Sequence, residues 1–382
     1  MLDTISVVAE PSCSPAALGH VLPRYGGVAA LVDPGRPWGH EHDRSSRDRL
    51  LERIAAYLDT DHLPASEGDA SAYGVLLVPG DTLDQSQSRY TTEGVEILGG
   101  VVPAMFIGTK AITHPLVDDE ADRPAAWSSV MADMMGDAAL TGFTAFSVRD
   151  AARAGRLLLA DGPVRLKDVC GKAGLGQTVV HDATSLDEML MQEDAAALAQ
   201  CGIVLEANLT DVITYSVGSV QLGEDSISYW GSQTLTVDRQ GREVYGGSDL
   251  CAVRGSFDAL AALDLPASVV RAIECAATFD RSAHLAYPDI RLTRRNYDVI
   301  EGTDHAGLRR IGVLEQSWRV GGASGAEIAA FEALRDEPDT TSVRCSTVEV
   351  YDLVTPPVGA ILYYQGDDPA VGPMTKYAVR LA

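Results

Sequence analysis

The sequence predicts a mixed α/β fold (α+β) in three parts. These are an N-terminal three-layer α/β domain over residues 1–115 and two α+β lobes over residues 116–209 and 210–382. Three observations lead to this prediction. A chain of 382 residues is long enough for roughly two or three domains with cores of their own. Strand and helix patterns alternate in its first half. Its second half is richer in runs with the two-residue period of strands.

The composition narrows the classes of partner. The net charge of −24 argues against nucleic acid or an anionic membrane surface. No apolar run is as long as a membrane span, and the N-terminus lacks the features of a signal peptide. Six cysteines are scattered without a C-x-x-C pair, a pattern that fits reduced thiols in a cytosol. We therefore expect a cytoplasmic protein that binds neither nucleic acid nor membranes.

The N-terminal part combines short strands with one amphipathic helix. The turn Pro79-Gly80-Asp81, which follows a strand, is typical of α/β domains. The expected elements are a strand at Thr4–Ala9, a helix at Ser45–Leu58, a strand at Tyr73–Val78 and a mostly apolar run at Gly94–Phe106.

The middle part has the pattern of a compact unit in which strands and helices alternate. Ser147 is a candidate N-cap, and Ser185 with Glu188 forms a candidate capping box. The expected elements are helices at Ala125–Asp137, Ser147–Leu158 and Ser185–Gln200, and strands at Phe143–Phe146 and Gly202–Leu205.

A glycine-rich hairpin lies within this unit. Residues 164–169 and 177–180 have strand character, and three glycines separate them. Such a hairpin can fold its backbone N–H groups over phosphates. Lys167 and Lys172 add charges suited to phosphates, and they are two of only four lysines against 26 arginines. The alternative is an ordinary hairpin with two solubilising lysines.

The C-terminal part reads as strands with three helices. The turn at residues 238–241 is typical of a hairpin, and a break at residues 264–266 divides one helical stretch. The expected strands are Val212–Leu222, Ser226–Val237, Glu243–Gly247, Ile290–Glu301, Leu308–Gln316, Ser342–Tyr351 and Val358–Tyr364, and the expected helical stretches are Ser256–Ala277 and Ala323–Arg335.

One of these strands carries groups suited to a metal and a phosphate. Glu315 and Ser317 are two residues apart, so an extended strand presents both on one face. Oxygen ligands at that spacing suit Mg²⁺, which binds through one or two carboxylates and substrate phosphates. Arg319 follows before a glycine pair, and an arginine beside such a site can stabilise a transferring phosphoryl group.

The order of a Lys/Gly hairpin, an acidic strand end about 30 residues later and a carboxylate strand downstream resembles the ATP-grasp superfamily. In that family a hairpin flap covers the nucleotide, a hinge strand reads the adenine, and a strand of the type E-x-N-x-R-x-G-G holds magnesium. The resemblance covers residues 116–335. The phrase S-W-R-V-G-G-A-S is also similar to a group of ATP-grasp-like proteins labelled biotin-carboxylase-like.

The resemblance implies roles for single residues of the middle part. Lys167 matches the family lysine that contacts the α- and β-phosphates. Arg123 stands where the family has an earlier phosphate-binding lysine, which keeps the charge but changes the geometry. Glu206 matches the hinge acid. The other implied nucleotide-binding residues are Gly171, Lys172, Gly174 and Gly176 in the flap, and Ala207, Asn208 and Leu209, whose backbone would pair with the adenine edge.

The resemblance also implies the metal ligands. Glu315 matches the main magnesium carboxylate, and Ser317 stands where the family has asparagine. The family needs a further acid on the neighbouring strand, for which Asp298, Glu301 and Asp289 are candidates. Asp298 and Glu301 are three residues apart and face opposite sides of a strand, so only one reaches the metal. We favour Asp298, because Glu301 adjoins a turn.

The implied activity is an ATP- and Mg²⁺-dependent ligation. A small-molecule carboxylate would become an acyl phosphate that an amine or similar nucleophile then attacks, with Lys167 neutralising phosphate charge and Arg319 stabilising the acyl phosphate. The arginines at 291, 294 and 295 are further candidates for holding an anionic substrate. The alternatives are an ATP-dependent carboxylase or phosphotransferase, a nucleotide-binding protein without turnover, and a structural protein that binds no nucleotide. A homodimer is left open.

Overall fold

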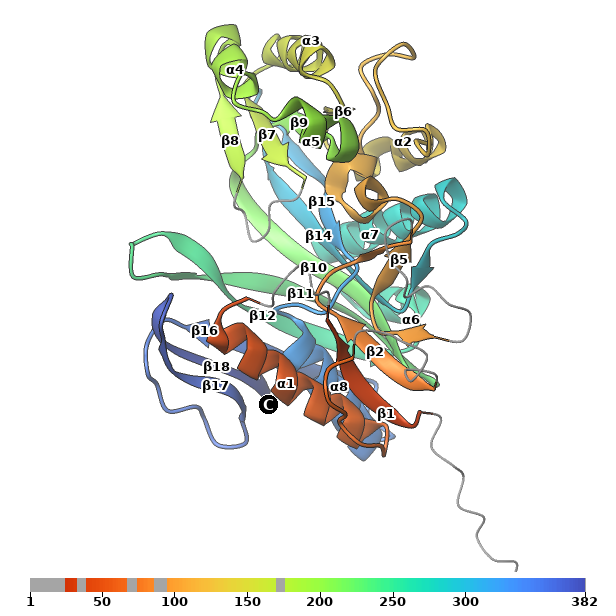
Figure 1. The fold of residues 1–382 in the computed structure, drawn as a ribbon, viewed down its shortest axis with the longest axis vertical. Coiled ribbons are helices and arrows are strands. Elements are labelled where there is room, and N and C mark those ends of the chain that lie inside the picture. The colour runs from red at the N-terminus through yellow and green to blue at the C-terminus, as the bar shows by residue number, and fades with distance from the viewer. Residues whose placement is uncertain (1–24, 33–38, 67–73, 86–94, 170–175, 382) are drawn as a thin grey trace, which may run out of the picture.

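The computed structural model describes residues 25–32, 39–66, 74–85, 95–169 and 176–381 (Figure 1). Its largest feature is an eight-stranded sheet whose neighbouring strands, in the pairs given by the register, are antiparallel. In sheet order its strands are β15 (Arg309–Ser317), β14 (Arg294–Thr303), β10 (Thr210–Leu222), β11 (Asp225–Val237), β12 (Glu243–Arg254), β16 (Ser342–Val350), β18 (Gly372–Arg380) and β17 (Ile361–Asp368).

Helices cover both faces of this sheet. One face packs under α6 (Phe257–Ala261) and α7 (Ala267–Ala286), with Phe279, Tyr297 and Trp318 fully buried between them. The other face packs under α8 (Ser324–Asp336), which contacts β12, β16 and β18. Strand β12 contributes to both sides, because Val253 belongs to the cluster under α6 and α7, whereas Leu250 and Ala252 belong to the cluster under α8.

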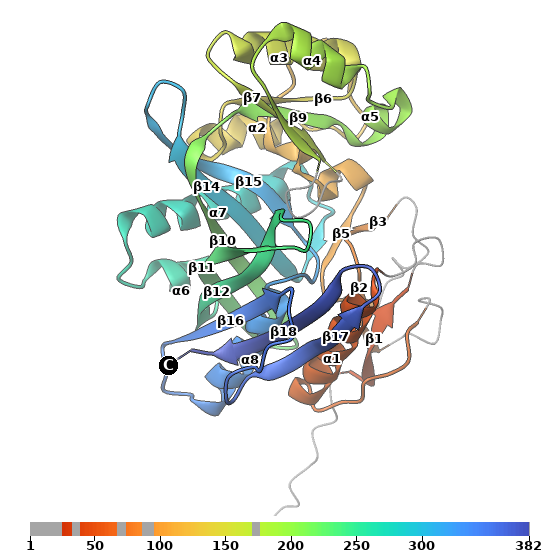
Figure 2. The same ribbon diagram turned by 90° about the vertical axis from the view of Figure 1, so that its left-hand side faces the viewer.

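The N-terminal part shares the core under α8. Strands β1 (Gly27–Leu31), β2 (Val75–Pro79) and β4 (Glu96–Ile97) form a parallel sheet, and α1 (Glu41–Tyr57) packs against β1, β17 and α8 (Figure 2). Buried residues of α1 and α8 belong to one cluster. A second small sheet of β3 (Leu83–Asp84), β5 (Gly100–Val102) and β13 (Arg291–Leu292) joins this part to residues near β14.

A four-stranded antiparallel sheet forms a separate lobe, at the top of Figure 1. Val164 and Leu166 of β7 point into the core under α3 and α4, so Lys167, the residue after Leu166, faces the other side of the sheet. The elements of this lobe are β6 (Gly142–Ala145), α3 (Val148–Leu159), β7 (Val164–Asp168), β8 (Gln177–Val180), α4 (Ala183–Leu190), α5 (Ala195–Cys201) and β9 (Ile203–Ala207).

Short helical segments connect the N-terminal part to this lobe. They are the 3₁₀ segments η2 (Met105–Gly108), η3 (Lys110–Thr113) and η4 (Gly136–Ala138), and the helix α2 (Val130–Met135). The helix expected at Ala125–Asp137 is thus limited to six residues. Residues before it form turns, and Trp127 there packs against Phe106 and Phe146.

Some expected elements differ in the structure. The helix predicted over Ser185–Gln200 is two helices, because Asp182 caps α4 and Asp194 caps α5 through backbone N–H groups. The predicted capping box at Ser185 is therefore wrong. Strand β18, which lies between β16 and β17 in the large sheet, was not predicted from the sequence. The strand expected at Thr4–Ala9 lies outside the described residues. No helix in the described part of the chain is long and apolar enough to cross a membrane.

Candidate functional site

Two carboxylates face each other on neighbouring strands of the large sheet. Asp298 of β14 lies directly opposite Glu315 of β15, and directly opposite residues share one face of a sheet. Ser216 Oγ donates to Asp298 Oδ1 at 3.1 Å, and Asn296 Nδ2 donates to the same oxygen at 2.9 Å. Burial and the nearby Glu315 carboxylate raise the pKa of Asp298 to about 6, from 3.8. The pair is therefore a site that favours a cation.

The other two candidate acids lie elsewhere. Glu301 accepts from Tyr215 at 3.0 Å and from Arg309 at 2.8 Å, and Tyr215 belongs to the core on the α7 side. Glu301 thus faces away from the pair, as its spacing from Asp298 predicts. Asp289 is exposed in the segment after α7. Only Asp298 of the three lies opposite Glu315.

Lys110 forms an ion pair with Glu315 of the acid pair, and this lysine was not among the residues predicted from the sequence. Its Nζ lies 2.5 Å from Glu315 Oε2, and its side chain is 4% exposed. Gln316, the next residue of β15, donates from its amide to the carbonyl oxygen of Ile107 at 3.4 Å and to that of Thr109. This contact holds the start of η3, and therefore Lys110, beside β15.

Arg123, which the resemblance implies as a phosphate ligand, is not part of this cluster. Its side chain is exposed and donates to the backbone oxygen of Asp119 at 2.7 Å. The expectation for Arg123 is therefore not supported by its position. The cation that contacts the acid pair comes from η3, 13 positions earlier along the sequence.

Lys167 lies in a buried ion pair beside β15. Its Nζ is 2.5 Å from Glu206 Oε1, and both side chains are at most 1% exposed. The ammonium also donates to Leu314 O at 3.3 Å, which leaves one of its three hydrogens for a further acceptor. His114 Nε2 lies 3.2 Å from the other oxygen of Glu206. Lys167, Glu206 and His114 thus form one buried network next to Glu315.

Burial and charge act in opposite directions within this network. Burial lowers the pKa of Lys167, and the nearby Glu206 carboxylate partly offsets that effect. Burial raises the pKa of Glu206, but Lys167 and His114 outweigh it, so the pKa of Glu206 is lowered overall. Each partner therefore favours the charged form of the other, and the loss of either would leave the remaining group buried without its main partner.

The hinge segment after Glu206 offers one open backbone donor. The N–H of Ala207 donates to Thr141 O at 2.8 Å, and that of Asn208 donates to Pro163 O at 3.0 Å. The N–H of Leu209 has no backbone acceptor in the described part of the chain. Arg165 fixes the Asn208 side chain at 2.7 Å. Leu209 N–H is thus the backbone donor of this segment that is left for an external acceptor.

The flap is described at both of its strands. Gly176, which directly precedes β8, has a φ of +74°, and a Cβ there would lie 2.9 Å from the Cβ of Asp168, so the turn requires glycine at this position. The flap residues Gly171, Lys172 and Gly174 lie outside the described residues.

Ser317 lies at the end of β15 beside a buried network. It is directly opposite Asn296, the residue that donates to Asp298. Arg294 Nη1 donates to Ser317 O at 3.0 Å, and the same guanidinium is paired with Glu327 of α8 at 2.6 Å. Tyr229 donates to Glu327 at 2.6 Å. The amide that the resemblance expects at position 317 is therefore present one strand away.

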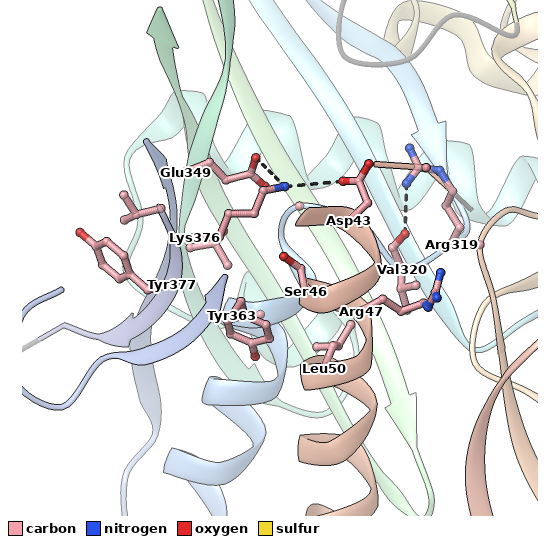
Figure 3. A pocket seen from close by; sticks show the side chains of 17 residues that line it. Asp43, Ser46, Arg47, Leu50, Arg319, Val320, Glu349, Tyr363, Lys376 and Tyr377 are labelled. Atoms are coloured by element: carbon pink, nitrogen blue, oxygen red, sulfur yellow. Dashed lines mark hydrogen bonds and ion pairs between the residues drawn. The ribbon is translucent and has the colours of Figure 1, made fainter. Parts of the chain in front are cut away.

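Two of the three arginines that were candidates for holding an anionic substrate are paired within the fold. Arg294 is buried against Glu327, and Arg295 pairs with Asp280 at 3.1 Å. Arg291 is exposed on β13. Arg319, in contrast, lines a cavity between α1, the start of α8 and the strands β16 and β18 (Figure 3). It donates to Val320 O at 3.0 Å, and Asp81 lies 3.8 Å from its Nε.

A row of polar side chains joins the acid pair to this cavity across one face of the sheet. The register places Glu315 beside Asp298, Asp298 beside Ser216, and Ser248 beside both Gln233 and Thr347. Gln233 connects the Glu315–Asp298–Ser216 half of the row to the Ser248–Thr347 half, because its amide donates to Ser216 Oγ at 3.1 Å. Two residues after Thr347 on β16, Glu349 lies opposite Lys376 of β18, and both side chains line the cavity.

The family model described as "Protein of unknown function (DUF3182)" matches residues 31–378. The chain belongs to this family. No curated protein matches the sequence.

Solved structures with this architecture bind nucleotides according to their descriptions. The chain is similar to N5-carboxyaminoimidazole synthetase from Staphylococcus aureus, complexed with ADP, at 11% identity and a TM-score of 0.53, with 94% of each chain covered. It is also similar to the biotin carboxylase–β-γ-ATP complex from Campylobacter jejuni, at 12% identity and a TM-score of 0.52, with 93% of this chain and 87% of that chain covered. The DUF3182 chain thus has the ATP-grasp fold, as the resemblance predicted.

Proposed function

We propose that this protein is an ATP- and Mg²⁺-dependent ligase that activates a small-molecule carboxylate as an acyl phosphate for attack by an amine or a similar nucleophile. The observation that carries the proposal is the Asp298–Glu315 pair with Lys110 and Lys167 beside it. Two acids and two ammonium groups within one cluster suit a triphosphate and its metal ion. The ATP-grasp fold supports the same reading.

The residues present fit a magnesium ion that shares its ligands with a nucleotide. No group of three or more His, Cys, Asp or Glu in the described part of the chain is arranged to hold a metal. Mg²⁺ is commonly held by one or two carboxylates together with substrate phosphates, so a facing pair is sufficient. Asp298 and Glu315 would hold the ion, and Asn296 adds an amide next to Asp298. When bound, Mg²⁺ would neutralise phosphate charge and polarise the γ-phosphoryl group.

The chain's own residues would then bind and orient the reactants. Leu209 N–H would donate to the adenine, and Lys167 and Lys110 would contact phosphate oxygens. The substrate carboxylate would attack the γ-phosphorus, which releases ADP and forms an acyl phosphate. Arg319 would stabilise the charge on that acyl phosphate. The nucleophile would then attack the acyl carbon, lose a proton and release inorganic phosphate.

A nucleotide-binding protein without turnover is the second candidate. Serine at position 317 in place of asparagine favours it, because one expected metal ligand is shortened. Asn296 opposite Ser317 argues for a complete site. Activity therefore has to decide between the two.

Binding is tested by the melting temperature with ATP and Mg²⁺, and turnover by ADP release with pooled carboxylates and amines. Hydroxylamine traps an acyl phosphate as a hydroxamate, so it reports activation without a known nucleophile. We expect Glu315→Gln to remove the Mg²⁺-dependent stabilisation. Glu301→Gln is the matched control, because Glu301 lies on the paired strand and faces the other side. No stabilisation of the wild type by ATP and Mg²⁺ would contradict the proposal, and binding without ADP or hydroxamate would favour the second candidate.

A further inference from the structure

The cavity beside Arg319 has a volume of about 430 Å³, within the range of small-molecule sites. It lies between α1, the Val320–Gly322 segment before α8, and the strands β16, β17 and β18 (Figure 3). Most of its charged wall comes from α1, β16 and β18, outside the segments that carry the ATP-grasp resemblance. These residues are therefore suited to determine which substrate is accepted.

One side of the cavity is positively charged. Arg319 and Arg47 both line it, and their side chains are 26% and 12% exposed. The acids near them, Asp81 at 3.8 Å and Asp48 at 3.6 Å, are not among the lining residues. Gly322 forms part of the same wall. A Cβ at Gly322 would lie 2.4 Å from the ring of Tyr245, so the wall there is bare backbone.

The other side carries an excess of negative charge. Lys376 Nζ lies 3.1 Å from Glu349 and 3.7 Å from Asp43. All three line the cavity, so two carboxylates share one ammonium. Asp43 is 47% exposed, and the oxygen that faces Lys376 also lies 3.1 Å from His42 Nδ1, so a second cation would bind its other oxygen.

A hydroxyl lies between the two sides. Ser46, one turn of α1 after Asp43, lines the cavity and occupies the middle of Figure 3. Its buried Oγ has no hydrogen-bond partner in the described part of the chain. An unsatisfied buried hydroxyl costs free energy unless a ligand or water pairs with it.

We infer that this cavity binds the carboxylate substrate, and that this substrate is a small amino-acid-type zwitterion. Its carboxylate lies toward Arg319 and Arg47, and its ammonium group lies beside the exposed carboxylate of Asp43. The charges of the two sides match such a ligand in order and in sign. The inference rests on the proposed function, because that function requires a substrate carboxylate that is phosphorylated.

The charge distribution also fits the proposed chemistry. Phosphoryl transfer to the carboxylate adds negative charge at the end of the ligand that faces the two arginines. The polar row described above leads from the acid pair to the cavity on one face of the sheet. The Tyr245 hydroxyl lies along this row, and the charges of both Glu349 and Asp298 act on it. Arg319, which lines the cavity, follows Glu315 by four residues, so the positively charged side of the cavity adjoins the end of the strand that carries the acid pair.

The test uses the full chain with ADP and Mg²⁺ present and measures ligand binding by saturation-transfer NMR and titration calorimetry. The probes are the common L-amino acids and D-alanine, the matched acids without an amine, such as propionate and succinate, and the matched amines without an acid, such as ethylamine. We expect at least one amino acid to bind about 10- to 100-fold more tightly than its matched acid and amine, because each charged hydrogen bond contributes on that scale.

Variants assign the two ends. Asp43→Asn should remove the preference for the amine, and Arg319→Gln should weaken binding of both the amino acid and the matched acid. Glu52→Gln, an exposed position on the same helix, should leave both unchanged. Stabilisation by ATP and Mg²⁺ in the same samples shows that each variant is folded.

Two results would overturn the inference while the proposed function stands. One is that ATP and Mg²⁺ stabilise the protein but no amino acid in the panel binds. The other is that a matched acid binds as tightly as its amino acid, or that Asp43→Asn does not change the preference. Failure of ATP and Mg²⁺ to stabilise the wild type would instead contradict the proposed function itself.

Discussion

The structure shows where the few lysines of this sequence are used. The sequence contains four lysines, and the three in the described residues are each paired with a glutamate: Lys110 with Glu315, Lys167 with Glu206 and Lys376 with Glu349. All three are less than 9% exposed. A surface charge tolerates arginine or lysine alike, whereas a site that needs a compact ammonium does not. The same reasoning that selected Lys167 from the sequence applies equally to Lys110 and Lys376.

The Lys167–Glu206 pair makes the simple test of Lys167 ambiguous. Lys167→Met leaves a buried carboxylate with only His114 beside it, and we expect a loss of about 3–5 kcal/mol in the free energy of unfolding. The double variant Lys167→Met, Glu206→Gln should recover much of that loss. Urea unfolding of the singles and the double measures the coupling.

The double variant then reports on nucleotide binding without the folding defect. If Lys167 contacts phosphate, the stable double variant still binds ATP more weakly than the single variant Glu206→Gln. Equal affinities would remove Lys167 from the phosphate site.

The raised pKa of Asp298 predicts a pH dependence with a defined sign. A carboxyl whose folded-state pKa is raised from 3.8 to about 6 binds its proton more tightly when folded, so the ligand-free protein loses stability as the pH rises across that interval. Asp298→Asn should therefore be more stable than the wild type by about 1–3 kcal/mol above about pH 7, and by much less near about pH 4. Melting curves across this range measure the difference.

The affinity for ATP and Mg²⁺ should change in the opposite direction. The metal requires the ionised carboxylate, so affinity rises as the pH increases through about 6 in the wild type. A stability difference that is independent of pH would show that Asp298 titrates near its ordinary value.

At the scale of elements, the Arg294–Glu327 pair joins β14 to α8 and also holds the end of β15 through Ser317 O. Glu327→Ala leaves a buried guanidinium unpaired, and we expect it to cost about 3–5 kcal/mol in urea unfolding. The double variant Arg294→Met, Glu327→Leu should cost substantially less, since no charge stays buried.

A more exposed pair on the same strands provides the control. Glu301→Ala breaks the Arg309–Glu301 contact of 2.8 Å and should change the stability by about 1 kcal/mol or less. If Glu327→Ala were equally mild, the network would not hold β15 in place.

At the scale of the whole molecule, the N-terminal part and the large sheet share one core. Leu51 and Ile54 of α1 and Phe331 of α8 are fully or almost fully buried in the same cluster, and α1 also supplies Asp43, Ser46 and Arg47 to the cavity. Removing residues 1–115 would expose the apolar side of α8. The structure thus makes the cavity beside Arg319 dependent on the packing of α1.

We expect a fragment of residues 116–382 to lose cooperative thermal unfolding and to bind a hydrophobic dye, as compact states without fixed packing do. Co-expression with residues 1–115 should restore the cooperative transition. A fragment that unfolds as cooperatively as the full chain would show that the N-terminal part is dispensable for the fold.

Several parts of this protein follow from the sequence alone. The two-residue alternation and the turn glycines predict most strands of the large sheet. The order of hairpin, acidic strand end and carboxylate strand carries the resemblance to the ATP-grasp superfamily, and that resemblance implies the fold. The three-residue spacing of Asp298 and Glu301 predicts that they face opposite sides. These are local properties of the chain, governed by backbone periodicity and by the sterics of glycine.

The tertiary structure determines which charged side chains pair with one another. Lys110 rather than Arg123 meets Glu315, because Gln316 of β15 holds the backbone before η3, and no local pattern encodes that contact. Asp43, Glu349 and Lys376 come from three distant segments and meet only after α1 packs on the sheet. Charge pairing depends on distance in space, and the distance between remote segments is set by how the shared core packs.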